Sequence, residues 1–175
     1  MMKQLLVLAA VLLGSLTAGA QNRYYYGGDV SFTVGSSGTR IVVYPEIGRR
    51  ISNNLYFGVA AGGGYYHHGS VSDFSMGITP HLRGYWFAWE RYGLSGDLHA
   101  TYRATRRQGY DPLIKTFETG LRPGVVIPIG NGASLTAQFG FFGYSRTDYG
   151  NQDIRSRWVA RLEAHDILIG VLMNL

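Results

Sequence analysis

The stretch LYFGVAAGGGY, Leu55 to Tyr65, decides the fold. Most of its odd-numbered positions hold a large or apolar side chain, while most of its even-numbered positions hold glycine or alanine. A period of two is the repeat of a β-strand, whose successive side chains point to opposite faces, and differs from the 3.6-residue period of a helix. One face of this strand is therefore apolar, and the other is made of small residues.

The same alternation continues on both sides of this stretch, which predicts seven further strands. Their ranges are Asp29–Val34, Arg40–Ile47, Phe74–Trp86, Leu94–Arg103, Phe117–Ile127, Ser134–Gly143 and Trp158–Leu175. In the seventh strand along the chain, Phe139 and Phe141 both fall on the apolar face. The last strand changes parity between Trp158 and Ile167, which predicts a β-bulge near Glu163 to Asp166.

The apolar face of these strands carries no charge. The other face carries Gly, Ser, Thr and charges of both signs: Asp29, Arg40, Glu46, Arg83, Asp97, Arg103, Glu118 and Arg122. Apolar-out, polar-in segments of about ten residues are the signature of an outer-membrane barrel. The predicted fold class is all-β: an eight-stranded antiparallel up-and-down transmembrane β-barrel. A soluble barrel also alternates, with its apolar face inward, but its outer face would carry many Lys and Glu.

Composition narrows the functional classes. The chain has 175 residues, no cysteine and 25 glycines, and charged residues make up 15%. One domain is expected from the length, and disulfides and Cys-ligated zinc are excluded. The net charge is +5, but the basic residues are scattered and form no stripe, so nucleic acid is not a predicted partner.

The first twenty residues read as a secretory signal peptide. Lys3 supplies the positive charge, Leu5–Leu13 form the apolar run, and Ala18-Gly19-Ala20 matches a cleavage site that leaves Gln21 at the new N-terminus. We therefore predict a cleaved segment 1–20 and a barrel domain 21–175. No later stretch reaches the 18 or so apolar residues of a membrane helix.

Connection lengths predict the orientation of the barrel. Connections near Gly48–Asn54, Phe87–Tyr92 and Gly130–Gly132 are short, while Tyr66–Asp73, Thr105–Lys115 and Ser145–Arg157 read as longer polar loops. Short periplasmic turns and longer outer loops are typical of these barrels. The three prolines inside strands, at positions 45, 80 and 123, are interpreted as bulges or twisted positions.

The charges of the polar face are predicted to pair inside the lumen. An eight-stranded barrel is just wide enough for side chains to fill it, and buried charges must be compensated. The predicted network, which is structural, comprises Arg40, Glu46, Arg83, Asp97, Arg103, Glu118 and Arg122. A plugged lumen argues against an open diffusion pore.

Other constellations give weaker indications. Ser95, Asp97 and His99 share one strand face but lie too far apart for a catalytic relay, so no catalytic residue, cofactor or metal is predicted. Four arginines at the expected outer rim could bind the phosphates of lipopolysaccharide, or simply be solvated. They are Arg106, Arg107, Arg155 and Arg157.

Four runs carry a resemblance to a known family. They are YPEIGRRISNNLYFGVAAG, ITPHLRGYWFAWERYGLSGDL, LRPGVVIPIGNGASLTAQFGFFGY and DILIGVLMNL. They resemble the small outer-membrane protein β-barrel domain family, which is similar in layout to the OmpA/OmpX-type barrels. The resemblance implies a Gram-negative outer-membrane location, insertion by the outer-membrane assembly machinery, a monomer and no shared catalytic site. Its members usually end in an aromatic residue, whereas this chain ends in Leu175.

Three functional hypotheses follow. The first is a structural or surface-interaction barrel of the outer membrane, in contact with its lipid. The second is a narrow, porin-like channel. The third is a secreted soluble barrel that binds a small apolar ligand.

Overall fold

The structure is a computed structural model that describes residues 24–35, 38–89, 92–130, 132–150, 153–162 and 167–174. The predicted signal peptide lies outside the described residues. The described residues form β-strands with short connections. They include no helix that is long and apolar enough to cross a membrane. The strand segments are β1 (Tyr24–Gly35), β2 (Gly38–Ser52), β3 (Leu55–His68), β4 (Val71–Trp89), β5 (Tyr92–Arg107), β6 (Tyr110–Gly130), β7 (Ala133–Gln138), β8 (Phe141–Asp148), β9 (Ile154–Arg161) and β10 (Leu168–Asn174).

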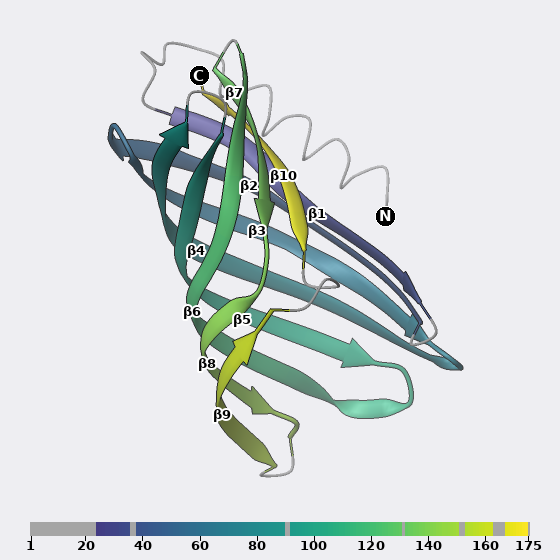
Figure 1. Cartoon of the computed structure of the whole chain (residues 1–175). Helices are drawn as coiled ribbons and strands as arrows, with labels where there is room; N and C mark the ends of the chain where they lie inside the picture. The colour runs from purple at the N-terminus through teal and green to yellow at the C-terminus, as the bar shows by residue number, and fades with distance from the viewer. Residues whose placement is uncertain are drawn as a thin grey trace.

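These segments form an eight-stranded antiparallel up-and-down barrel (Figure 1). β1 to β6 each pair with the next strand in sequence. β7 and β8 both pair with β6, so together they make the seventh strand. β9 pairs with β8 and β10 with β7, which makes the eighth. β10 then pairs with β1 and closes the ring, so the predicted fold class is confirmed.

The seventh strand changes parity at Gly140, which corrects one prediction. Gly140 has φ +72°, a left-handed conformation that glycine adopts without the steric penalty of other residues. Phe139 is 37% exposed on the outside, but Phe141 is buried inside the barrel. The predicted outward position of Phe141 is therefore wrong. Strict alternation assumes an unbroken strand, and the irregular conformation at Gly140 shifts every later residue of the strand to the opposite face.

The eighth strand also changes parity, as predicted. Trp158 in β9 and Ile169 in β10 both point outward, although one has an even and the other an odd number. Two outward residues of opposite parity require an irregularity between the two segments. The predicted bulge at Glu163 to Asp166 itself lies outside the described residues.

Closure of the ring differs between the two ends of the barrel. We call the end that carries Tyr24 and Asn174 the terminal end, and the end that carries the Gly69 and Gly109 turns the hairpin end. The β1–β10 ladder begins at Tyr25–Asn174 and reaches Val30–Ile169. Beyond Val30, toward the hairpin end, β1 pairs with β2 alone among the described segments. Figure 1 shows β9 well separated from the far end of β1.

The predicted long loops at the hairpin end are wrong. Most of their residues continue the strand ladders; Tyr66, for example, pairs with Asp73, and Arg107 with Tyr110. Gly69 and Gly109, with φ +57° and +75°, lie in two-residue turns. The asymmetry between the two ends therefore lies in how far the hairpins extend.

The predicted bulge is wrong at Pro45 and Pro80, where the ladders on both sides keep their register. Pro123 lies where the β6–β8 ladder is followed by the β6–β7 ladder with a shift of one residue. Pro45, Pro80 and Pro123 pair with Gly28, Val59 and Gly96, and the register is continuous through each pairing. On the other side, the β2–β3 ladder omits Tyr44 and Pro45, and the β4–β5 ladder omits Thr79 and Pro80. The missing N–H of these two prolines therefore interrupts a ladder without shifting its register.

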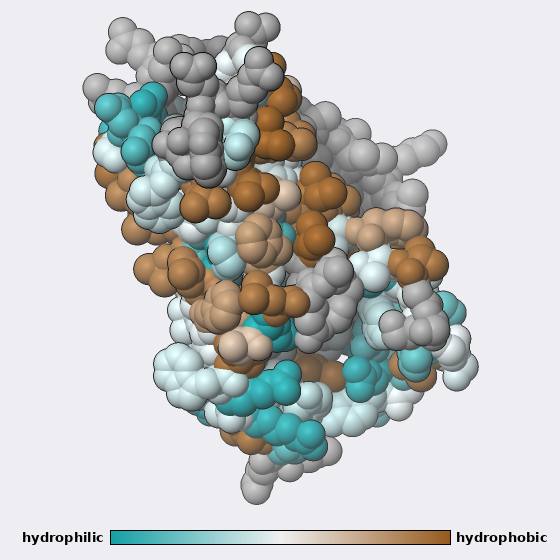
Figure 2. Space-filling model, viewed as in Figure 1, coloured by the Kyte–Doolittle hydropathy of each residue, from teal (hydrophilic) through white to brown (hydrophobic). Residues whose placement is uncertain are grey.

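The outer face of the barrel is apolar. Large hydrophobic side chains are exposed on every strand, and Figure 2 shows them across the middle of the barrel, with hydrophilic residues gathered toward its ends. The buried set, in contrast, is mostly polar and includes Glu46, Arg83, Asp97 and Thr136. The barrel is thus inverted relative to a soluble domain, whose polar residues mostly face outward.

Candidate functional site in the barrel lumen

Strand register places three charges in one row across the inner wall. Arg83 on β4 lies opposite Asp97 on β5, and Asp97 lies opposite Arg122 on β6. All three occupy inward positions of the alternation, so one carboxylate faces an arginine on each side. Directly opposed residues on antiparallel strands are close enough for their side chains to interact.

Arg83, rather than Arg122, forms an ion pair with the carboxylate of Asp97. Its Nε lies 2.8 Å from Oδ1 of Asp97, and its Nη2 lies 2.8 Å from Oδ2. The guanidinium also donates to Glu46 on β2, with Nη1 2.8 Å from Oε1 and Nη2 3.2 Å from Oε2. The Arg83 side chain is 1% exposed. Such two-pronged charge-assisted bonds are the strong ones, and here one arginine binds two carboxylates from two strands.

Polar neighbours complete this Arg83 cluster. Gln138 on β7 donates to Oδ2 of Asp97 at 3.0 Å. Nε2 of His81 lies 3.6 Å from Oε2 of Glu46 and 3.0 Å from the hydroxyl of Tyr25. The cluster therefore joins side chains of β1, β2, β4, β5 and β7 across the lumen.

An aromatic cluster lies on the terminal side of these charges. The rings of Tyr25 and Tyr56 meet edge to face at 5.6 Å, and those of Tyr56 and Tyr85 at 5.1 Å. Val126 and Leu172 pack with them. Edge-to-face packing is a favoured aromatic geometry, and it places three rings in the lumen near its terminal end.

Charge pairing is looser toward the hairpin end. Glu118 lies 3.5 Å from Nη2 of Arg103 and 3.7 Å from Nη2 of Arg161. The Arg103 and Arg161 side chains are 29% and 34% exposed. These distances and exposures belong to a partly hydrated network, in which each pair contributes less than in a buried one.

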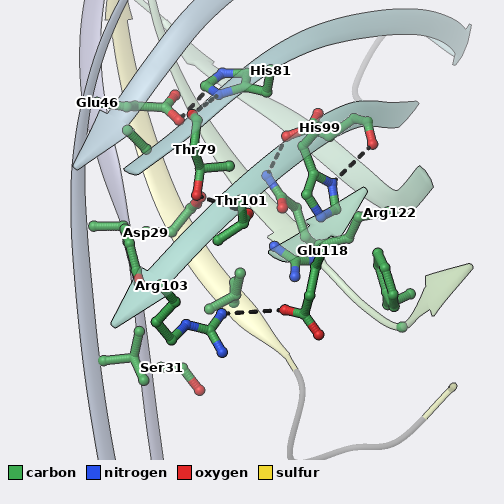
Figure 3. A pocket seen from close by; sticks show the side chains of 18 of the residues that line it. Asp29, Ser31, Glu46, Thr79, His81, His99, Thr101, Arg103, Glu118 and Arg122 are labelled. Carbon is green, nitrogen blue, oxygen red and sulfur yellow. Dashed lines mark hydrogen bonds and ion pairs between the residues drawn. The ribbon is translucent and has the colours of Figure 1, made fainter. Parts of the chain in front are cut away.

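The two remaining arginines of the predicted lumen network line cavities. Arg40 lines the cavities beside the Arg103 group. Arg122 lines a cavity of about 130 Å³ at the level of the Arg83 cluster, and its Nε is buried without a hydrogen-bond partner. Figure 3 shows this cavity with Arg122, His99 and Glu118 on its wall.

Asp97 and His99 are not arranged as members of a catalytic triad. The Asp97 carboxylate binds Arg83. Nδ1 of His99 lies 3.5 Å from the Asp97 backbone carbonyl, and the His99 ring packs against Phe141. A triad needs the carboxylate on the imidazole and the imidazole on a nucleophile. In the described part of the chain, no group of three or more His, Cys, Asp or Glu side chains could hold a metal ion.

The four predicted lipid-contacting arginines are exposed near the hairpin end but do not form one patch. Arg106 and Arg107 end β5, while Arg155 and Arg157 lie on β9, with β6 and β8 between them. Arg107 binds Asp73, with Nη2 2.9 Å from Oδ2. This hydrogen bond raises the pKa of the Arg107 guanidinium above its ordinary value.

Arg155 has a carboxylate partner of its own. Its Nη2 lies 3.2 Å from Oδ2 of Asp153. Arg106 and Arg157 remain as the two whose guanidinium groups have no ion pair in the described structure.

The predicted lumen network leaves out several residues that belong to it. Asp29, His81 and Gln138 occupy inward positions, so their parity and polarity could have identified them. Arg161 has the inward parity of β9, opposite to that of Trp158, and could have been found in the same way. Phe141 could not, because it follows the break at Gly140.

Comparison with known proteins identifies the fold class. The chain has the closed eight-stranded antiparallel barrel of an outer-membrane protein. The crystal structure of Neisserial surface protein A (NspA) matches 90% of this chain and 99% of its own chain, with a TM-score of 0.51 and 18% sequence identity. At this identity the match establishes the fold alone, and it confirms the predicted likeness to small outer-membrane barrels.

Other comparisons add little. The crystal structure of a major outer membrane protein from Thermus thermophilus covers 87% of this chain and 98% of its own, with 12% identity and a TM-score of 0.38. That score is too low to carry an argument. No protein-family model and no curated protein sequence matches the chain.

Proposed function

We propose that the chain is an integral outer-membrane protein with a structural or surface-interaction role, and that side chains close its lumen. It reaches the outer membrane after export and removal of residues 1–20. The NspA-like fold supports this location.

One observation carries the membrane assignment. Leu98 is 56% exposed at the middle of β5, while its neighbours Asp97 and His99 are buried in the lumen. The same inversion repeats around the barrel, so large apolar side chains cover much of its outside. A water-soluble monomer rarely exposes apolar patches larger than a few hundred Å², whereas lipid chains are the natural solvent for such a surface.

The lumen contacts favour a plug over a channel. Arg83 reaches from β4 to Glu46 on β2, and the Tyr25–Tyr56–Tyr85 cluster lies between this bridge and the terminal end. An ion would have to break a buried salt bridge or displace packed rings in order to pass. We therefore expect planar bilayers that contain the protein to show no steady conductance, and a large steady conductance would defeat the plug.

The proposed role is not enzymatic. Asp97, the one carboxylate beside His99 on β5, is held by Arg83 and Gln138. The partners proposed instead are outer-membrane lipid and, during biogenesis, the outer-membrane assembly machinery. The barrel is proposed to act as a monomer.

Lipopolysaccharide is a proposed partner of the rim arginines. Arg106 and Arg157 carry the larger share, because Arg107 and Arg155 already bind carboxylates. Replacing Arg106 and Arg157 by Ser should reduce binding of purified lipopolysaccharide, and replacing Arg107 and Arg155 should reduce it less. Equal binding by both double variants and the wild type would refute this partner.

Fractionation tests the proposal as a whole. The native protein should sediment with outer membranes and migrate differently on a gel before and after boiling, because a closed barrel resists detergent until heated. Recovery in the soluble periplasmic fraction would instead support the soluble barrel that binds an apolar ligand.

A further inference from the structure

The charges around the 130 Å³ cavity do not balance. Five arginines and four carboxylates line it. Glu46 and Asp97 are bound by Arg83, and Glu118 lies between Arg103 and Arg161. These residues are Arg40, Arg83, Arg103, Arg122, Arg161, Asp29, Glu46, Asp97 and Glu118. With His81 and His99 neutral, the enclosed space carries one surplus positive charge.

Among these five arginines, Arg122 is the one with no hydrogen bond or ion pair to a described residue. Its Nε is buried and has no hydrogen-bond partner. Its cross-strand neighbour Asp97 is occupied, since Arg83 and Gln138 hold both carboxylate oxygens. Arginine has five N–H donors and stays charged in proteins, so the unmet demand is for an acceptor that carries negative charge.

The break in the seventh strand explains why no residue of β7 or β8 is paired with Arg122. The β6–β8 ladder ends at Leu121–Phe142, and the β6–β7 ladder begins at Gly124–Gln138. Arg122 falls between these two ladders, so it has no paired residue on that side. The cavity therefore opens where a cross-strand partner would otherwise stand, and Phe141 and Leu168 supply part of its wall. Asp29 lines the same cavity, and its Oδ1 is also buried without a hydrogen-bond partner.

We propose that this cavity binds one small inorganic anion, with chloride as the physiological example, against the guanidinium of Arg122. The hydroxyl of Tyr44, another lining residue, is a buried donor without a partner. The surplus charge calls for a single negative charge, and the enclosed volume suits a halide. This site is independent of the role proposed above, because it depends only on the lumen.

Bromide locates the site directly. The full protein, purified in detergent and crystallised with bromide in place of chloride, should show an anomalous difference peak in contact with the Arg122 guanidinium. Arg122→Met, crystallised in the same way, should lose that peak but keep any peaks on the surface. Water alone at Arg122 in the wild type would overturn the proposal.

Stability gives a second readout in solution. At constant ionic strength, the midpoint of heat modification should be higher in chloride than in gluconate, a bulky anion that the cavity does not admit. Arg122→Met should abolish this difference, whereas Arg50→Met, near the end of β2 and bonded to Asn53 of the following turn, should retain it. If Arg122→Met does not fold, Arg122→Gln serves in both experiments. An undiminished chloride effect in the Arg122 variant would contradict the site.

Discussion

The two halves of the lumen differ in how their charged side chains are paired. In the terminal half, the ring of strands is closed by the β1–β10 ladder, and Arg83 is buried against two carboxylates, with tyrosine rings beneath it. In the hairpin half, β1 has no described partner on its β9 side, and Glu118 shares looser contacts with two partly exposed arginines. A cavity of about 580 Å³ opens there, lined by Tyr44, Tyr66 and others.

The difference shows what closing the lumen requires. A buried arginine needs carboxylates on more than one side of its guanidinium group. Different strands can supply them only where the wall of the barrel is complete. Where the wall is incomplete, water compensates the charges and the ion pairs weaken. The terminal half should therefore supply most of the stability, and the hairpin half should tolerate change.

Arg83→Met should have the largest effect. It leaves Glu46 and Asp97 buried without their cation, and removing one member of a buried ion pair costs about 3–5 kcal/mol. Arg103→Met, in the looser half, should cost about 1 kcal/mol or less. Urea unfolding in lipid vesicles measures both. Equal losses would mean that the two halves do not differ.

Leu98→Arg should come next. A charge facing lipid at the middle of the barrel costs about 2–4 kcal/mol, and the cost falls to about 0–1 kcal/mol near an interface. Val34→Arg, outward on β1 near the hairpin end, is the matched control. The same unfolding assay measures both variants. A loss of unfolding free energy for Leu98→Arg no larger than that for Val34→Arg would argue against lipid contact.

Gly140→Ala tests the break beside the Arg122 cavity. A left-handed alanine costs about 1–2 kcal/mol, and a Cβ on Gly140 would also lie 2.5 Å from the Arg161 carbonyl oxygen. Gly109→Ala has a similar φ but meets nothing within 4 Å. The heat-modification midpoint should fall further for Gly140→Ala, and an equal fall would remove the steric part of the argument.

Asp73→Asn should have the smallest effect. It removes the carboxylate from Arg107 at the exposed rim, where such pairs contribute about 0–1 kcal/mol. Unfolding at low and high salt should differ less in the variant than in the wild type. A loss comparable to that of Arg83→Met would contradict the division between the two halves.

Much of the fold could be predicted from the alternation of apolar and small or polar residues alone. Leu55 to Tyr65 and its counterparts have a clear period of two, and a single period assigns both the strand and its lumen face. The parity change between Trp158 and Ile167 is also visible in the sequence, whereas the break at Gly140 is not. A glycine in a glycine-rich strand carries no distinctive local signal, so Phe141 was assigned to the wrong face.

The ion pairs in the lumen could not be predicted from the sequence. Parity places Arg83, Asp97 and Arg122 inside, but the row leaves two arginines competing for one carboxylate. Glu46, three strands away from Asp97 in the ring, decides the outcome by reaching Arg83 across the lumen. No local pattern encodes that contact, because it depends on the width of the barrel and on the length of both side chains.

Single-cysteine spin labelling tests most directly whether lipid surrounds the uncharged row, because the chain has no native cysteine. Labels at Leu98→Cys and Thr101→Cys, on opposite faces of β5, would be read in vesicles by their relaxation with oxygen and with a water-soluble nickel complex. The account predicts that the Leu98 label is relaxed by oxygen and shielded from nickel, and that the Thr101 label is shielded from oxygen. A Leu98 label that is open to nickel, with Thr101 in an apolar interior, would contradict it.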